Sequence, residues 1–259
     1  MPFLQTETAR IHYLLEGGAN APVIAFSNSL GTNYSMWDLQ AAVFRTKFRI
    51  LRYDTRGHGE SSTTPGPYSI DSLGKDALAL LDALHLEQIH FCGLSMGGMI
   101  GMWLALNASH RLKKLMLCNT GAKIGTIEGW NARIETVRKN GMKAIGPAVI
   151  ERWFTPTFRE KNSASIANIQ KALEETNPEG YAACCAAVRD FDCRGDLGKI
   201  RVPTLVISGA SDPATPPADG RFLAGQIPGA QYAELHAAHL SNIEDRDRFN
   251  DEVGNFLAG

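Results

Sequence analysis

Short apolar runs recur along the chain, and the segments between them carry apolar residues roughly every three to four positions. Runs of about four to eight apolar residues are typical of buried strands. They occur within residues 22–28, 48–54, 88–95, 113–121, 203–212 and 230–239, and a half-alternating stretch covers 9–17. Residues 69–86 have helical spacing, with Ser69 and Asp71 as candidate capping residues. Buried strands that alternate with helices predict an α/β fold with a mainly parallel central sheet and helices on both faces.

The alternation stops between residues 122 and 195, where no strand pattern occurs. Segments with helical spacing follow one another there, at residues 126–140, 143–154, 162–176 and 178–191. Gly141, Pro156 and Pro178 separate them. Ligands of α/β proteins bind outside the carboxyl ends of the strands, so a helical insertion between two strands should cover that edge. We therefore predict a helical lid at 122–195, inserted into a core formed by residues 1–121 and 196–259.

The segment GLSMG, residues 93–97, matches the pattern G-x-S-x-G. In this pattern a sharp turn between a strand and a helix exposes a nucleophilic serine. The pattern alone is weak, but here the apolar run 88–92 precedes it and the apolar segment 96–108 follows it. This context predicts Ser95 as a nucleophile at a helix N-terminus, where free amides favour developing negative charge. The alternative is an incidental serine in a glycine-rich turn.

A serine hydroxyl needs a base to take its proton and a third group to orient that base. Asp212 follows one predicted strand and His239 follows the next, which gives the order serine, acid, base that accompanies the G-x-S-x-G turn. We predict that Asp212 is the acid and that His239, before a final helix at 241–257, is the base. The less well placed rivals are His236, which ends a strand, His58 in another loop, and Asp190, Asp192 and Asp196, which precede the strand that should carry the acid.

Composition narrows the possible partners. The net charge is -1 and no run of Lys or Arg occurs, so we expect no nucleic-acid partner. No secretory signal and no apolar stretch of membrane-spanning length is recognisable, so no membrane association is expected. The 5 cysteines are irregularly spaced, which disfavours a disulfide framework or a zinc site and favours small apolar residues in a reducing cytoplasm. The oligomeric state is left open.

The motifs together resemble those of the α/β-hydrolase superfamily. The resemblance rests on FSNSLGTNYSMW, YDTRGHGESS, GLSMGG, SGASDPATPP and HAAHLSNIE, which span nearly the whole chain. Within the superfamily, the chain is most similar to the 3-oxoadipate enol-lactonase family, on the segments SNSLGTNYSMWD, CGLSMGGMIGMWLA and NTGAKIGTIEGWNARIETVR. The last segment, which enters the predicted lid, is the most discriminating because lids diverge with substrate. YDTRGHGESS is a family marker, to which we assign a packing role and no catalytic one.

The resemblance also suggests an oxyanion hole, for which acyl transfer needs two backbone N–H donors. Met96, the residue after the nucleophile, should supply one. Counting back from Trp37, which matches a tryptophan of the relatives, places the second at Leu30. Many relatives carry His-Gly where this chain has Asn28-Ser29, a departure that leaves the register of this donor open by about one residue.

The resemblance implies hydrolysis of 3-oxoadipate enol-lactone to 3-oxoadipate in bacterial aromatic catabolism, with no metal and no cofactor. The substrate carries a free carboxylate, for which an arginine is the preferred partner. Trp130 and Arg133 lie at i and i+3 on a predicted helix and could face one cleft. We predict that Arg133 binds the carboxylate and Trp130 walls the pocket; Arg138 and Arg152 are the alternatives. Trp153 belongs either to the pocket wall or to the lid core.

Two other classes of function remain open. Other carboxylesterases, perhydrolases and C–C hydrolases share such a triad, and only substrate profiling separates them. A binding protein on a hydrolase scaffold is less favoured, because such proteins often lose a triad residue and all three positions are filled here. Labelling of Ser95 by a fluorophosphonate would distinguish an enzyme from a binding protein.

Overall fold

A computed structural model describes residues 2–259. Its strands are β1 (Phe3–Gln5), β2 (Arg10–Glu16), β3 (Val23–Ser27), β4 (Arg49–Tyr53), β5 (Ile89–Leu94), β6 (Leu112–Cys118), β7 (Thr204–Gly209) and β8 (Gln231–Leu235). They form one 8-stranded sheet in the order β1-β2-β4-β3-β5-β6-β7-β8. β2 pairs in antiparallel fashion with both β1 and β4. The other six strands, β3 to β8, all run parallel to one another. The predicted α/β fold with a mainly parallel sheet is confirmed.

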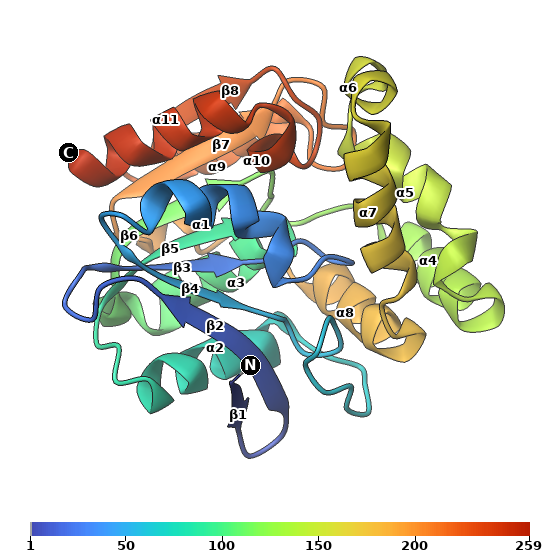
Figure 1. Ribbon diagram of the computed structural model, residues 1–259, viewed down its shortest axis with the longest axis horizontal. Helices are drawn as coiled ribbons and strands as arrows, with labels where there is room; N and C mark the ends of the chain where they lie inside the picture. The colour runs from blue at the N-terminus through green and yellow to red at the C-terminus, as the bar shows by residue number, and fades with distance from the viewer. Residues whose placement is uncertain (1) are drawn as a thin grey trace.

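Helices cover both faces of this sheet. Those of the core are α1 (Asp38–Phe44), α2 (Ile70–Ala83), α3 (Met96–Asn107), α9 (Pro217–Gln226), α10 (Ser241–Glu244) and α11 (Arg246–Ala258). Figure 1 shows α1 and α11 on one face and α2 and α3 on the other. Right-handed β-α-β connections explain why the helices lie on two faces. The connection through α1 runs from β3 to β4, and the connection through α3 runs in the opposite direction along the sheet, from β5 to β6, so the two helices lie on opposite faces.

The core follows from the apolar pattern. The parallel strands β3, β5 and β7 are buried along their whole length, as continuous apolar runs require. α3 is apolar all round and lies between the sheet and α2. α2 begins at the predicted cap, because the Ser69 hydroxyl accepts the Ser72 N–H and Asp71 lies in the first turn. The predicted cap at Ser69 is therefore confirmed, whereas Asp71, the other candidate, lies inside the helix and is not the cap.

The segment between β6 and β7 is helical and lies beside the sheet (Figure 1). Its helices are α4 (Ile127–Asn140), α5 (Gly146–Trp153), α6 (Pro156–Lys161), α7 (Ser163–Glu174) and α8 (Pro178–Asp190). The two chain segments that connect it to the core lie side by side, since the Cys193 N–H donates to the Ala122 carbonyl (3.0 Å). We refer to α4–α8 as the lid.

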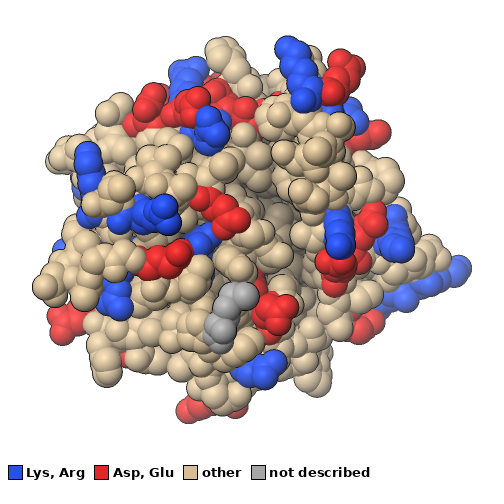
Figure 2. Space-filling model, viewed as in Figure 1, with Lys and Arg blue, Asp and Glu red and all other residues tan. Residues whose placement is uncertain are grey.

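The surface carries a mixture of charges. Over the face shown in Figure 2, Lys and Arg are interspersed with Asp and Glu, in keeping with the net charge of -1. Among the helices of residues 2–259, none is both long enough and apolar enough to cross a membrane.

Candidate active site

Ser95 lies between β5 and α3, at the carboxyl edge of the sheet. Its φ of 57° and ψ of -115° fall in a region that residues with side chains rarely adopt. The turn is possible because its neighbours are small. A Cβ on Gly93 would lie 2.1 Å from the Gly97 carbonyl oxygen, and a Cβ on Gly97 would collide with the backbone of β3. The Ser95 N–H donates to the Cys118 carbonyl (2.9 Å), and the Thr120 hydroxyl donates to the Ser95 carbonyl (2.7 Å), so both sides of the turn are held.

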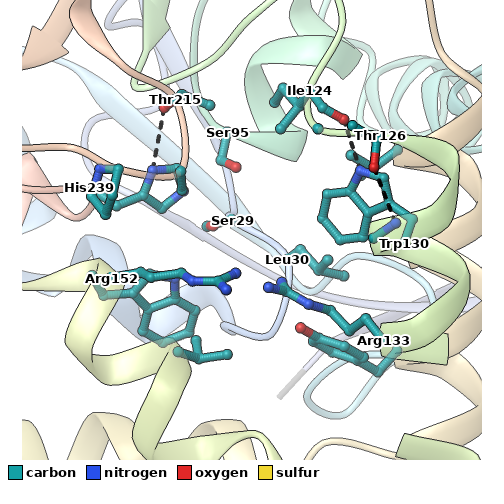
Figure 3. Close-up of a pocket in the computed structure, with 18 residues that line it drawn as sticks. Ser29, Leu30, Ser95, Ile124, Thr126, Trp130, Arg133, Arg152, Thr215 and His239 are labelled. Atoms are coloured by element: carbon teal, nitrogen blue, oxygen red, sulfur yellow. Dashed lines mark hydrogen bonds between the residues drawn. The ribbon is translucent and has the colours of Figure 1, made fainter. Parts of the chain in front are cut away.

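Asp212 and His239 follow β7 and β8 at the same edge. His239 Nδ1 lies 2.8 Å from Asp212 Oδ2, and both side chains are buried. A carboxylate can only accept, so Nδ1 carries the proton and Nε2 is the nitrogen free for chemistry. His239 and Ser95 line the same cavity (Figure 3), although no hydrogen bond joins their side chains among residues 2–259. The structure thus brings the three predicted residues into one place.

The carboxylate of Asp212 accepts hydrogen bonds at both oxygens. Oδ1 accepts the N–H groups of Ala214 (2.8 Å) and Thr215 (3.0 Å). Oδ2 accepts the Thr215 hydroxyl (2.6 Å) and the Asn119 amide (3.0 Å) in addition to His239. Burial by itself raises the pKa of Asp212, but His239 and these hydrogen bonds outweigh it and hold the pKa below its ordinary value. Asp212 therefore stays ionised at neutral pH and can orient the imidazole.

Asn119 connects the acid to the loop that carries the base, and the sequence alone did not identify it. Its side-chain amide also donates to the Ala238 carbonyl (3.1 Å), and its amide oxygen accepts the Ser241 hydroxyl (2.6 Å). Its φ is 44°, a left-handed conformation that asparagine tolerates better than most residues. The available signal was an asparagine directly after the strand β6, at the same sheet edge as the predicted triad.

The loop after β3 borders the cavity. Leu30 lines the cavity together with Ser95. The Ser29 N–H lies 3.4 Å from a methionine sulfur, and the Gly31 N–H donates to His58 Nε2 (2.9 Å). In the part of the chain that the structure describes, the N–H groups of Leu30 and Met96 have no hydrogen-bond partner. The Leu30 N–H, at the cavity, and the Met96 N–H, next to Ser95, are therefore not used within the protein.

Asn28, the residue that departs from the relatives' histidine, fastens the start of this loop. Its side-chain amide donates to the Tyr53 carbonyl at the end of β4 (2.7 Å). Its own carbonyl accepts the Gly97 N–H of α3 (3.0 Å). The departure thus leaves the loop attached to both the sheet and the nucleophile helix.

The cavity has a volume of about 470 Å³ and lies between the sheet edge and the lid. Figure 3 shows Ser95 and His239 on one side, while Arg133 of α4 and Arg152 of α5 extend toward each other on the opposite side. No acidic side chain lines the cavity, and neither arginine pairs with a carboxylate, within residues 2–259. The cavity is therefore positively charged at the end remote from the serine.

The predicted lid residues occupy the wall of this cavity. Trp130 and Arg133 both line it, and the guanidinium carbon lies 5.0 Å from the centre of the indole ring. The indole N–H donates to the Ile124 carbonyl (2.7 Å), which fixes the ring. Trp153 is buried and also lines the cavity, so it belongs both to the wall and to the lid core. Arg138 pairs with an exposed glutamate and lies outside the cavity.

Arg152, named only as an alternative from the sequence, faces the cavity as Arg133 does. Burial lowers the pKa of Arg152, and the neighbouring charge of Arg133 lowers it further, while Tyr181 acts in the opposite direction. Arginine nevertheless remains protonated at neutral pH. Two cations that line one cavity without a carboxylate partner among residues 2–259 favour an anionic ligand.

The other residues considered as the acid or the base, His236, Asp192 and His58, lie outside the cavity that contains Ser95. His236 is exposed, and Asp192 pairs with Arg194 (2.6 Å) and Lys123 (3.5 Å). His58 is buried against the loop that carries Leu30. Among residues 2–259, no group of three or more His, Cys, Asp or Glu side chains is arranged to hold a metal ion.

Comparison with known proteins gives consistent matches. The family defined by the alpha/beta hydrolase fold matches residues 14–246. Two proteins of Acinetobacter baylyi are similar along their length: 3-oxoadipate enol-lactonase 2 is 45% identical (96% of this chain, 94% of that protein), and 3-oxoadipate enol-lactonase 1 is 41% identical (94% and 91%). The crystal structure of the enol-lactonase from Burkholderia xenovorans LB400 superposes with a TM-score of 0.98 at 45% identity, covering 100% of both chains.

Proposed function

The chain belongs to the α/β-hydrolase family, and on this premise we propose that it hydrolyses 3-oxoadipate enol-lactone to 3-oxoadipate, a step in the breakdown of aromatic compounds. The observation that carries the proposal is the cavity, with Ser95 and His239 on one side and, on the other, two arginines that have no carboxylate partner among residues 2–259. The substrate has a lactone carbonyl and a free carboxylate, which this arrangement accommodates together. The relatives named 3-oxoadipate enol-lactonase, at 41% and 45% identity, support the same substrate.

In the first half of the proposed reaction, Ser95 Oγ attacks the lactone carbonyl carbon while His239 Nε2 takes its proton. Asp212, 2.8 Å from Nδ1, holds the imidazole in the required tautomer and stabilises the imidazolium. The N–H groups of Leu30 and Met96 stabilise the oxyanion. Removal of one such donor typically lowers kcat about 10²- to 10³-fold.

The tetrahedral intermediate then collapses, and the bond between the carbonyl carbon and the ring oxygen breaks. The imidazolium returns its proton to the departing enol oxygen. Because the substrate is a ring, the leaving group stays attached to the acyl chain, and Ser95 now carries the whole molecule as an ester. The enol converts to the ketone, and no second product needs to leave the cavity at this stage.

In the second half, water replaces the serine hydroxyl as nucleophile. His239 takes a proton from the water, the same N–H donors stabilise the second oxyanion, and the proton passes to Ser95 Oγ as it leaves. The product carries two carboxylates, one at the former lactone carbonyl and one held by the arginines. We assign the second of these to Arg133, with Arg152 beside it.

The test is an assay of purified protein on 3-oxoadipate enol-lactone, in which loss of the lactone's ultraviolet absorbance is measured over time. We expect kcat/KM of about 10⁴ M⁻¹ s⁻¹ or higher. Ser95→Ala should abolish the reaction, and a fluorophosphonate should label the unaltered protein but not this variant. A simple activated ester without charge serves as the second substrate.

The pattern of results separates the possibilities. Cleavage of the uncharged ester but not of the lactone would contradict the proposed substrate and leave a general esterase. Failure of both reactions together with no labelling of folded protein would contradict the assignment of Ser95 as nucleophile.

A further inference from the structure

His58 is the central residue of the segment RGHGES, to which no catalytic role has been assigned. Its side chain is only 1% exposed and lies outside the set of residues that line the cavity. Its Nε2 accepts the Gly31 N–H at 2.9 Å. Gly31 directly follows Leu30, whose N–H is the proposed second oxyanion donor. His58 therefore contacts the residue next to the proposed oxyanion donor but does not contact the reacting groups.

The direction of this hydrogen bond requires a neutral imidazole. A nitrogen that accepts from a backbone N–H cannot carry a proton, so the proton of His58 is on Nδ1, which lies 3.4 Å from the Arg56 carbonyl. Burial lowers the pKa of His58 to about 4. The groups of α8 that face the ring are uncharged, because burial raises the pKa of both the Cys184 thiol and the Tyr181 phenol.

Gly31 leaves the loop little freedom to compensate if this bond is lost. Its φ is +84°, and a Cβ there would lie 2.6 Å from a methyl group of Leu173 and 3.1 Å from the ring of Tyr181. The loop is thus held between the lid and His58. Without an acceptor, the Gly31 N–H would be buried and unsatisfied, which is unfavourable. Rotation of the neighbouring peptide units could restore a partner, but it would turn the Leu30 N–H away from the cavity.

We propose that His58 is a positioning residue for the oxyanion hole: by accepting the Gly31 N–H, it fixes the loop so that the Leu30 N–H points at the reacting carbonyl. The inference rests on the proposed ester hydrolysis at Ser95 but not on the identity of the acyl group. It predicts an effect on kcat that is the same for every ester. This distinguishes His58 from the arginines, whose effect should depend on the charge of the substrate.

The test compares His58→Phe with His58→Gln. Phenylalanine fills the space of the ring but cannot accept a hydrogen bond, whereas the amide oxygen of glutamine can reach the position of Nε2 and accept the Gly31 N–H. His236→Gln, which alters an exposed histidine, is the control. The measurements are kcat and KM on the lactone and on an uncharged activated ester, with circular dichroism and thermal denaturation to establish folding.

We expect His58→Phe to lower kcat about 10- to 100-fold, less than the about 10²- to 10³-fold typical of deleting a donor outright. The loss should be equal on both substrates, with KM within about threefold, and His58→Gln should recover most of it. A folded His58→Phe variant with unaltered kcat would overturn the inference. So would a loss confined to KM, or an equal loss in His58→Gln.

A replacement variant and the uncharged ester cover two cases in which the main comparison fails. If His58→Phe does not fold, His58→Asn replaces it, because the asparagine amide mimics Nδ1 and cannot reach Gly31; it should lower kcat as the phenylalanine variant would. If the unaltered protein cleaves the ester but not the lactone, the proposed substrate fails, while the kcat ratio on the ester still decides the role of His58.

Discussion

Arg133 and Arg152 are the residues on which discrimination between substrates is expected to depend. They face one cavity, they lack a carboxylate partner among residues 2–259, and burial together with Arg133 lowers the pKa of Arg152. A carboxylate placed between them relieves the repulsion between the two guanidinium groups. Arginine also offers two parallel N–H donors to a carboxylate, which a lysine cannot.

Replacing either arginine should therefore weaken binding of a charged substrate selectively. We expect Arg133→Ala to raise KM for the lactone about 10- to 100-fold, as loss of a charge-assisted hydrogen bond of about 1.5–3 kcal/mol implies. Arg152→Ala should act in the same direction, and Arg133→Lys should lie between. On the uncharged ester KM should change less than about threefold.

The matched control is Arg138→Ala, since Arg138 lies on the same helix but outside the cavity and pairs with Glu179 at the surface. Steady-state kinetics on both substrates are sufficient. Equal effects of Arg133→Ala on the lactone and on the uncharged ester would show that the arginine supports the lid rather than binding the carboxylate.

At this scale the sequence locates groups that sit at strand ends and misses groups that act through contacts distant along the chain. Ser95, Asp212 and His239 could be predicted because Ser95 directly follows β5, and the other two lie in the loops after β7 and β8, in the expected order. Asn119 could not, because its importance lies in a 3.0 Å contact with Asp212, 93 residues further along. The bond between Gly31 and His58 was equally invisible to periodicity and motif.

At the scale of elements, Glu244 joins the lid to the loop that carries the base. Its Oε2 accepts the Ala238 N–H (2.8 Å), next to His239. Its Oε1 accepts the Thr155 N–H (3.1 Å) and the Thr155 hydroxyl. Thr155 is the N-cap of α6, and Glu244 ends α10, so one carboxylate connects two helices and the histidine loop.

Removing this carboxylate should affect stability and catalysis together. We expect Glu244→Ala to lower the free energy of unfolding by about 1–3 kcal/mol, because two part-buried N–H groups lose their acceptor. It should also lower kcat, because the loop next to His239 loosens. Glu244→Gln keeps an acceptor oxygen and should be milder.

Urea denaturation and kinetics on the uncharged ester would measure both effects. Glu252→Ala is the control, since that carboxylate makes only a 4.0 Å contact with Arg248. Unaltered kcat in a destabilised Glu244→Ala would restrict the residue to a structural role.

The elements missed from the sequence share a cause. The short helix α6 was not predicted: Pro156 does mark a boundary between lid helices, as expected, but it also begins α6, where its missing N–H costs nothing. The single helix predicted at 241–257 is wrong: α10 and α11 are separated at Asp245, whose carboxylate accepts the His236 N–H (3.0 Å). β1 has only 3 residues and depends on pairing with β2. Each depends on tertiary contacts that local periodicity does not encode.

At the scale of the whole molecule, the alternation of apolar runs and helical segments was sufficient to predict the sheet, its covering helices and a helical segment between β6 and β7. The full lining of the cavity was not predictable, because it arises where side chains of α4 and α5 meet the segments that follow the five strands β3, β5, β6, β7 and β8. Burial of titratable groups inside this fold has a further consequence. His58 and His90 both have their pKa lowered to about 4 by burial, with Lys114 and Lys113 adding to the effect at His90.

These histidines make the free energy of unfolding depend on pH. Between about pH 6.5, the ordinary value for histidine, and about pH 4, the value for buried His58, the unfolded chain binds a proton that the folded protein does not. The free energy of unfolding therefore falls as the pH falls through this window. The difference of about 2.5 pKa units corresponds to at most about 3 kcal/mol for His58. Asp212 acts in a lower window, since its folded pKa is depressed and its stabilising effect is lost only as the pH falls below about 4.

His58→Gln isolates this effect, because glutamine does not titrate and His90 is common to both proteins. We expect the unaltered protein to lose up to about 3 kcal/mol relative to His58→Gln between pH 7 and pH 4, measured by urea denaturation at several pH values. Below about pH 6.5, the free energy of unfolding should fall more steeply with decreasing pH for the unaltered protein than for His58→Gln. A difference between the two proteins that stays constant across this range would mean that folding does not lower the pKa of His58.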